Sequence, residues 1–179
     1  MKRLFCSLLV CMVVVCHGQK SLQLGYFGPI GNEPGLSLGF NGQQGIGPGV
    51  IELGSSISFW SRNKDNQNFL LQQEFGYQLN KRDHKSKLVL SLGLGYLAQL
   101  EMTSFSVNLQ GEVVNKEREL RNIFLPSTFL EFNSPISTKL KWYVKLGYAY
   151  RISSHLNHAS FMGGLGIRYL LNTKANNDE

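Results

Sequence analysis

The residue types best suited to chemistry gather between positions 153 and 160. Ser153, Ser154 and Ser160 flank His155 and His158, and a serine activated by a histidine is a common nucleophile of acyl hydrolases. No nucleophile-elbow motif surrounds these serines, and no pattern ties an acidic residue to the histidines. Two histidines without a nearby third ligand also make a weak metal site. The segment is therefore interpreted as a polar loop, and the chain is predicted to have no catalytic residue, no metal site and no cofactor.

Three other segments could carry chemistry. Residues 42–49 are rich in glycine but lack the Lys-Ser/Thr ending of a phosphate-binding loop, so a turn is the favoured interpretation. His84 stands in the charged run 81–85, which is typical of a solvated turn. A third segment mixes charges of both signs, and it could contact lipopolysaccharide phosphates or a partner protein, or form a plain solvated loop. Its charged residues are Glu112, Lys116, Glu117, Arg118, Glu119 and Arg121.

The first 18 residues have the layout of a secretory signal peptide. Lys2 and Arg3 precede the apolar run 4–16, and small Gly18 stands before the expected cleavage point, so the mature chain would begin at Gln19. The run is shorter than the roughly 20 residues of a spanning helix, which makes a membrane anchor the less favoured alternative. A lipoprotein is disfavoured further, because valine precedes the cysteines at positions 11 and 16.

Cysteine use and charge narrow the class of the mature chain. All three cysteines lie within the predicted signal peptide, so the exported protein would have neither disulfides nor a thiolate metal site. The formal net charge of the full sequence is +6, and removal of Lys2 and Arg3 lowers it to +4, a mild excess that is scattered along the chain. It is compatible with an acidic lipid surface but gives no basic patch of the kind that binds nucleic acid.

The elements that must position these residues are strands, because apolar and small or polar residues alternate with a period of two along the chain. In 139–152 every even position from Leu140 to Ile152 is apolar or aromatic, whereas a helix would mix the two sets on each face. We predict eight strands, at residues 21–27, 34–41, 49–60, 68–79, 87–100, 123–133, 139–152 and 158–171.

The connections between these strands are rich in turn formers, and no linker or break in composition divides the chain. Residues 19–171 are therefore expected to form one domain, followed by the polar tail 172–179. An even strand count puts both ends on one side. If that side is the periplasm, the long loop predicted at 101–122 lies outside, as transmembrane barrels prefer.

Two faces result from the alternation, and their composition suggests which face is enclosed. One face is apolar, bounded by aromatics that suit a membrane interface. The opposite face is mostly glycine and serine, which fit the narrow lumen of an eight-stranded barrel, and opposite charges there would pair. The predicted lumen charges are Glu52, Glu74, Glu131, Lys141, Lys145, Arg151 and Arg168. The predicted interface aromatics are Trp142, Tyr150 and Tyr169. On this assignment Leu146→Arg should block membrane assembly, and Gly147→Ser should be tolerated much better.

Short motifs of glycine and aromatic residues recur along the chain. They include residues 24–29 (LGYFGP), 34–39 (PGLSLG), 74–77 (EFGY) and 92–97 (LGLGYL). With them the chain resembles uncharacterised outer-membrane β-barrel proteins of Bacteroidetes-type bacteria, a resemblance that implies the barrel class and brings no catalytic residues. Gly164, Ile167 and Tyr169 also resemble the C-terminal assembly signal of such barrels, although Met162 and the polar tail depart from it.

Together these observations predict an all-β protein: a single antiparallel up-and-down β-barrel of about eight strands, of the transmembrane type, in the outer membrane. Its lumen would be closed, since eight strands leave no aqueous pore, and its role would be structural or one of surface interaction. The expected partners are outer-membrane lipid, lipopolysaccharide and the outer-membrane assembly machinery. Two alternatives remain open: a soluble periplasmic lipocalin-like ligand-binding barrel and a lipid-modifying enzyme of the outer membrane.

Overall fold

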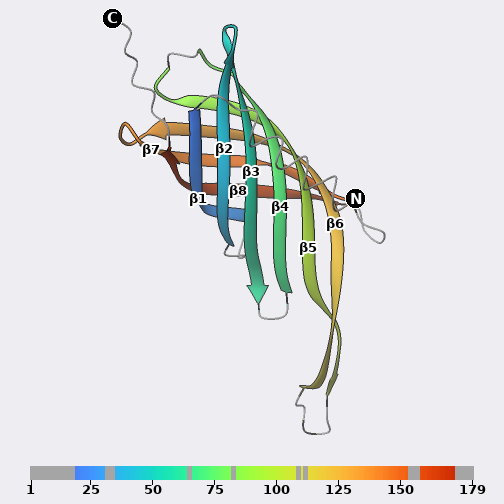
Figure 1. Cartoon of the computed structure of the whole chain (residues 1–179). Helices are drawn as coiled ribbons and strands as arrows, with labels where there is room; N and C mark the ends of the chain where they lie inside the picture. The colour runs from blue at the N-terminus through green and yellow to red at the C-terminus, as the bar shows by residue number, and fades with distance from the viewer. Residues whose placement is uncertain are drawn as a thin grey trace, which may run out of the picture.

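The computed structural model describes residues 19–30, 35–63, 66–81, 84–107, 110, 113–152 and 158–171. These residues form the strands β1 (Gln19–Pro29), β2 (Gly35–Ile46), β3 (Gly49–Asn63), β4 (Asn66–Gln78), β5 (Lys87–Val107), β6 (Val113–Pro135), β7 (Leu140–Arg151) and β8 (His158–Leu170). Each strand pairs antiparallel with the next, and β8 pairs with β1, so the sheet closes into a barrel (Figure 1). The predicted fold class and the strand count of eight are confirmed.

Closure gives every strand a paired neighbour on each side, so the wall has no free edge. The register Ser21↔Leu170 places the start of β1 beside the end of β8. We call this the terminal end of the barrel, and the opposite end the ribbon end. None of the described residues forms a helix long and apolar enough to cross a membrane. The predicted signal peptide (1–18) and tail (172–179) lie outside the described residues.

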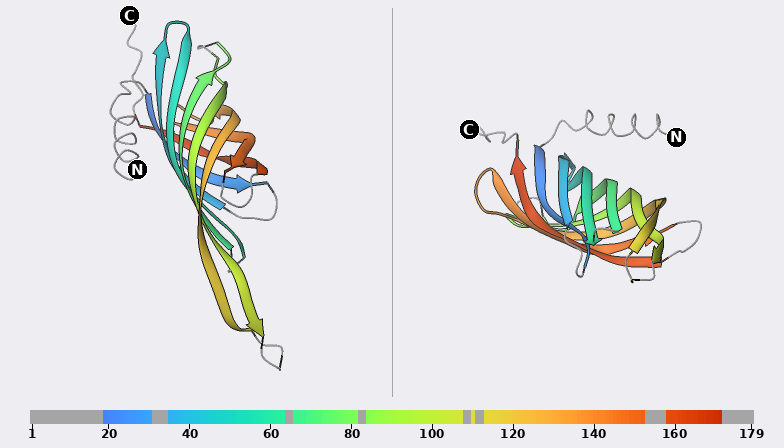
Figure 2. Two further views of the ribbon diagram at one scale, coloured as in Figure 1. Left: turned by 90° about the vertical axis from the view of Figure 1, so that its right-hand side faces the viewer. Right: turned by 90° about the horizontal axis from the view of Figure 1, so that it is seen from below.

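The loop predicted at 101–122 is wrong for most of its length. β5 continues to Val107 and β6 starts at Val113, so the two strands form a two-stranded ribbon beyond the barrel wall (Figures 1 and 2). We use "the ribbon" for residues 101–107 and 113–121. Its exposed charges interrupt the alternation that reveals a half-buried strand. Ladder hydrogen bonds and cross-strand contacts hold it instead, such as that of Ser104 Oγ with Glu117 Oε2 at 2.7 Å.

The turn predicted at 42–48 is also shorter than expected. β2 remains paired with β3 as far as Ile46↔Gly49, and only Gly47 and Pro48 form the turn. Gly47 has a φ of 57°, the positive value that tight hairpins require at this position and that glycine adopts without strain. The polar and glycine residues before Gly47 were predicted to form a loop because their composition is typical of turns, yet they belong to β2.

Gly147 brings β7 directly against β6, so a serine there should be tolerated less well than the composition of this face suggests. A Cβ atom at this position would lie 2.0 Å from the carbonyl oxygen of Thr128 and 2.8 Å from Cα of Phe129. Both are backbone atoms and cannot rotate away. The matched position is Gly28, where a Cβ would meet its nearest neighbour at an ordinary 3.5 Å.

Gly147→Ser should therefore destabilise the folded barrel by about 1–3 kcal/mol or more, the usual cost of overpacking. Gly28→Ser should change its stability by much less. Urea unfolding of both variants in detergent micelles, followed by tryptophan fluorescence, measures the difference. Equal midpoints for the two variants would contradict the close β6–β7 approach.

Candidate functional site

The outer wall of the barrel is covered by exposed apolar side chains. They occupy alternate positions on all eight strands, and each strand contributes at least one. One representative from each strand, in order, is Leu24, Leu38, Ile57, Phe75, Leu92, Leu130, Leu146 and Ile167. Soluble monomers rarely expose continuous apolar patches larger than a few hundred Å², so a wall of this kind calls for an apolar environment around the barrel.

Aromatic side chains with a polar atom lie near both ends of this wall. Trp142 and Tyr169 are exposed near the terminal end, and Tyr150 is exposed near the ribbon end. Trp142 packs against Phe132 with ring centroids 5.4 Å apart. Tyr96, which was not among the predicted interface aromatics, donates from its hydroxyl to Oδ1 of Asn122 at 2.7 Å. In residues 88–96 the apolar residues occupy the even positions. Tyr96 is one of them, and this alternation could have identified it as an outward-facing aromatic residue.

Inside the barrel, Arg168 of β8 is the centre of a buried charge cluster. One guanidinium nitrogen lies 2.6 Å from Oε1 of Glu52, and the other donates to both carboxylate oxygens of Glu131, at 2.8 and 3.0 Å. Glu52 is on β3 and Glu131 on β6, and neither strand adjoins β8. The contacts must therefore cross the interior of the barrel. The Arg168 side chain is 1% exposed.

A second ion pair crosses the interior closer to the ribbon end. Lys145 of β7 binds Glu74 of β4, and its ammonium lies 4.8 Å from the centre of the Phe129 ring and 5.5 Å from that of Phe27. Aromatic faces attract a cation, so the rings add to the stabilisation of Lys145. Lys141 is also buried. Arg151, the last of the predicted lumen charges, is half-buried at the ribbon end of β7.

Amides complete the hydrogen bonding of these carboxylates. Gln43 donates to Glu52 at 2.8 Å and Asn133 donates to Glu131 at 3.0 Å. A cavity of about 10 Å³ lies beside Glu52, Glu74 and Glu131, enough for about one water. Buried charges are tolerated when they are paired and hydrogen-bonded. This arrangement suits a filled interior better than a water-filled channel.

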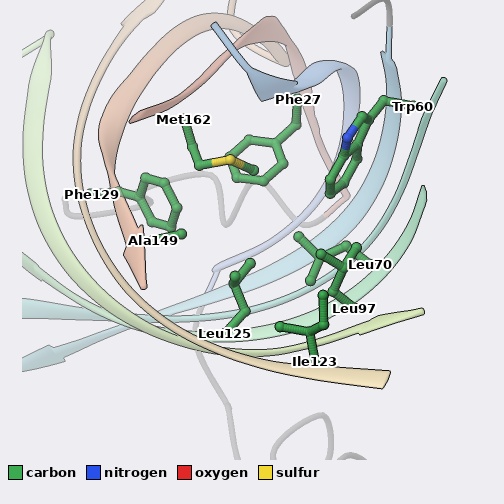
Figure 3. Close-up of a cluster of buried hydrophobic side chains, with 9 residues drawn as sticks. All are labelled: Phe27, Trp60, Leu70, Leu97, Ile123, Leu125, Phe129, Ala149 and Met162. Atoms are coloured by element: carbon green, nitrogen blue, oxygen red, sulfur yellow. The ribbon is translucent and has the colours of Figure 1, made fainter. Parts of the chain in front are cut away.

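An apolar cluster lies in the ribbon half of the interior, as the close-up in Figure 3 shows. Side chains from seven strands meet there, with the rings of Phe27 and Phe129 edge to face at 5.4 Å. The cluster consists of Phe27, Trp60, Leu70, Leu97, Ile123, Leu125, Phe129, Ala149 and Met162. This cluster, which we call the apolar plug, was not predicted from the sequence. Trp60 shares the parity of Glu52 and Ser58, so extending each alternation to the strand ends would have placed it inside.

The candidate nucleophiles and metal ligands are not brought into a site among the described residues. His158 is exposed at the start of β8 and Ser160 is half-buried, while His155 and the serines at 153 and 154 lie outside the described residues. His84 is exposed, and its backbone N–H donates to the carbonyl of Lys81 at 3.2 Å, as in a turn. The described parts of the chain contain no group of three or more His, Cys, Asp or Glu residues placed to hold a metal.

Several solved structures have a backbone similar to that of this chain. The N-terminal β-barrel domain of Pseudomonas aeruginosa OprF superposes with a TM-score of 0.52 at 13% identity, over 86% of this chain and 97% of that domain. Neisserial surface protein A (NspA) gives 0.48 at 11% identity, over 84% and 94% of the two chains. Ail, the attachment invasion locus protein of Yersinia pestis, gives 0.46 at 14%, over 85% and 99%. No family model and no curated protein matches the chain.

Proposed function

We propose that this protein is a small integral barrel of the outer membrane, with a closed lumen and a structural or surface-interaction role. The observation that carries the proposal is the distribution of side chains between the two sides of the wall. Large apolar residues face outward on every strand, and paired charges are enclosed. The OprF domain supports it through the shared fold.

A barrel wall must match the medium that surrounds it. In a bilayer core, backbone polar groups must be satisfied within the protein, and a closed barrel does this. The outward leucines and isoleucines then contact hydrocarbon. A soluble lipocalin-like barrel requires the reverse, with a polar outer surface and an apolar ligand cavity. Here the described interior is occupied by ion pairs and by the apolar plug.

The proposed orientation places the terminal end in the periplasm and the ribbon outside the cell. It follows the preference of outer-membrane barrels for short periplasmic turns and longer external loops, and it agrees with an exported chain that begins at Gln19. Trp142 and Tyr169 then lie at the inner interface and Tyr150 at the outer one. The exposed ribbon, with residues such as Phe105 and Arg118, would then be available for contacts outside the cell.

The resemblance of the motifs at 24–29 and 92–97 to barrels of Bacteroidetes-type bacteria fits this proposal. Lipopolysaccharide and outer-membrane lipid are the partners that the apolar wall would meet. The outer-membrane assembly machinery would recognise the last strand, where Gly164, Ile167 and Tyr169 lie. The interior ion pairs and the apolar plug serve to hold the barrel closed.

Fractionation of cells that produce the full chain tests the proposal. The protein should sediment with outer membranes, resist extraction by carbonate at high pH, and migrate faster on a detergent gel when it is not heated, as folded barrels do. Release into a periplasmic extract without detergent would contradict membrane insertion and favour the soluble alternative.

A further inference from the structure

A groove crosses the outer wall over β6, in the half of the barrel nearest the ribbon. Its volume is about 530 Å³. Leu92 and Leu94 of β5 form one side, and Tyr148 and Tyr150 of β7 form the other. Pro126 and Thr128 lie along the bottom because their side chains are shorter than those of their neighbours. The small residues Gly93, Ser127 and Ala149 complete the lining of the groove.

The strand pairing is broken at the same place. The β6–β7 ladder runs from Pro135↔Lys141 to Ser127↔Ala149, and one isolated bridge, Phe124↔Ile152, continues the same register. Between them the register sets Pro126 opposite Tyr150. Proline is rarely found in the middle of a sheet because it has no N–H to donate.

The register also identifies which bond is lost. Phe124 and Ile152 exchange both backbone hydrogen bonds, at 3.2 and 2.9 Å. In an antiparallel pair such hydrogen-bonded positions recur every second residue, so Pro126 and Tyr150 occupy the next one. The Tyr150 carbonyl consequently faces a position on β6 that cannot donate to it. A carbonyl in an apolar wall is costly when no donor reaches it.

We propose that this groove binds a hydroxylated acyl chain of lipid A, and this inference rests on the proposed membrane location. The leucine and tyrosine sides supply an apolar slot continuous with the lipid-facing wall. The position near Tyr150 and the ribbon places the groove in the outer leaflet, where lipid A is found. A hydroxyl on the acyl chain can donate to the Tyr150 carbonyl, whereas the plain acyl chains of phospholipids carry no such donor.

Two variants separate the apolar slot from the hydroxyl contact. Thr128→Trp fills the groove, and Ile57→Trp is its matched control, because Ile57 faces outward on β3 away from the groove. Pro126→Val restores a backbone N–H opposite Tyr150 while keeping an apolar side chain. It should leave the slot open and remove the need for a donor from the lipid.

The experiment is native mass spectrometry of the full barrel reconstituted with equal amounts of lipid A, a lipid A analogue without acyl hydroxyls, and phosphatidylethanolamine. The wild type and Ile57→Trp should retain lipid A at least about five-fold over either competitor. Thr128→Trp should lose this retention. Pro126→Val should bind the two forms of lipid A equally.

Equal retention of all three lipids by the wild type, or undiminished lipid A on Thr128→Trp, would overturn the inference. If Thr128→Trp fails to fold, Tyr148→Ala removes one side of the groove and should also lower retention. A wild-type protein that stays in the periplasmic extract defeats the proposed function itself. A membrane-inserted protein that shows no preference for lipid A contradicts only the proposal that the groove binds lipid A.

Discussion

Leu146→Arg should prevent the barrel from assembling in the outer membrane, and Leu120→Arg should not. The two leucines are similarly exposed, at 45% and 60%, so exposure alone cannot separate them. Leu146 lies near the middle of β7 in the barrel wall, where an arginine facing lipid costs about 2–4 kcal/mol. Leu120 lies on the ribbon, beyond the wall, where water can solvate the guanidinium.

The measurement is the amount of heat-modifiable, folded protein in the outer-membrane fraction at equal expression. Leu146→Arg should reduce it to a small fraction of the wild-type amount, and Leu120→Arg should leave it unchanged. In a soluble barrel both leucines would face water and both arginines would be accepted. Equal tolerance of the two substitutions would therefore place the apolar wall in water.

Arg168→Met should be the most destabilising change in the interior. It leaves Glu52 and Glu131 buried near each other without the cation that binds both. Breaking a buried ion pair by removing one partner costs about 3–5 kcal/mol, because the remaining charge is uncompensated. The matched control is Arg121→Met on the ribbon, where Arg121 also binds two glutamates but its side chain is 34% exposed. Exposed pairs contribute about 0–1 kcal/mol.

Urea unfolding of refolded protein in micelles measures both changes. The combined variant Arg168→Met, Glu52→Gln and Glu131→Gln should recover much of the lost stability, because it removes the stranded charges together with their partner. If Arg168→Met and Arg121→Met shift the midpoint equally, the interior cluster is solvated and the lumen is open.

Local chemistry was sufficient to predict the barrel wall. Alternation depends only on the positions of residues within one strand, because successive side chains point to opposite faces. The outward position of Leu146 and the inward position of Lys145 therefore follow from their even and odd positions. Aromatic residues at strand ends and the even strand count follow from the same pattern. The ribbon was missed because neither of its faces is buried in a barrel, and its residues therefore show no alternation that a sequence pattern could detect.

Relations across the barrel were decided by the tertiary structure. Arg168 meets Glu52 and Glu131, and Lys145 meets Glu74, only because closure and strand stagger bring non-adjacent strands to the same height. The apolar plug around Trp60 and the contact that forbids a side chain at Gly147 depend on the same packing. The amino-acid sequence determined which side of each strand is apolar, because the polarity of a side chain is a property of the single residue. Which residues meet inside required the closed sheet, because those distances depend on all eight strands at once.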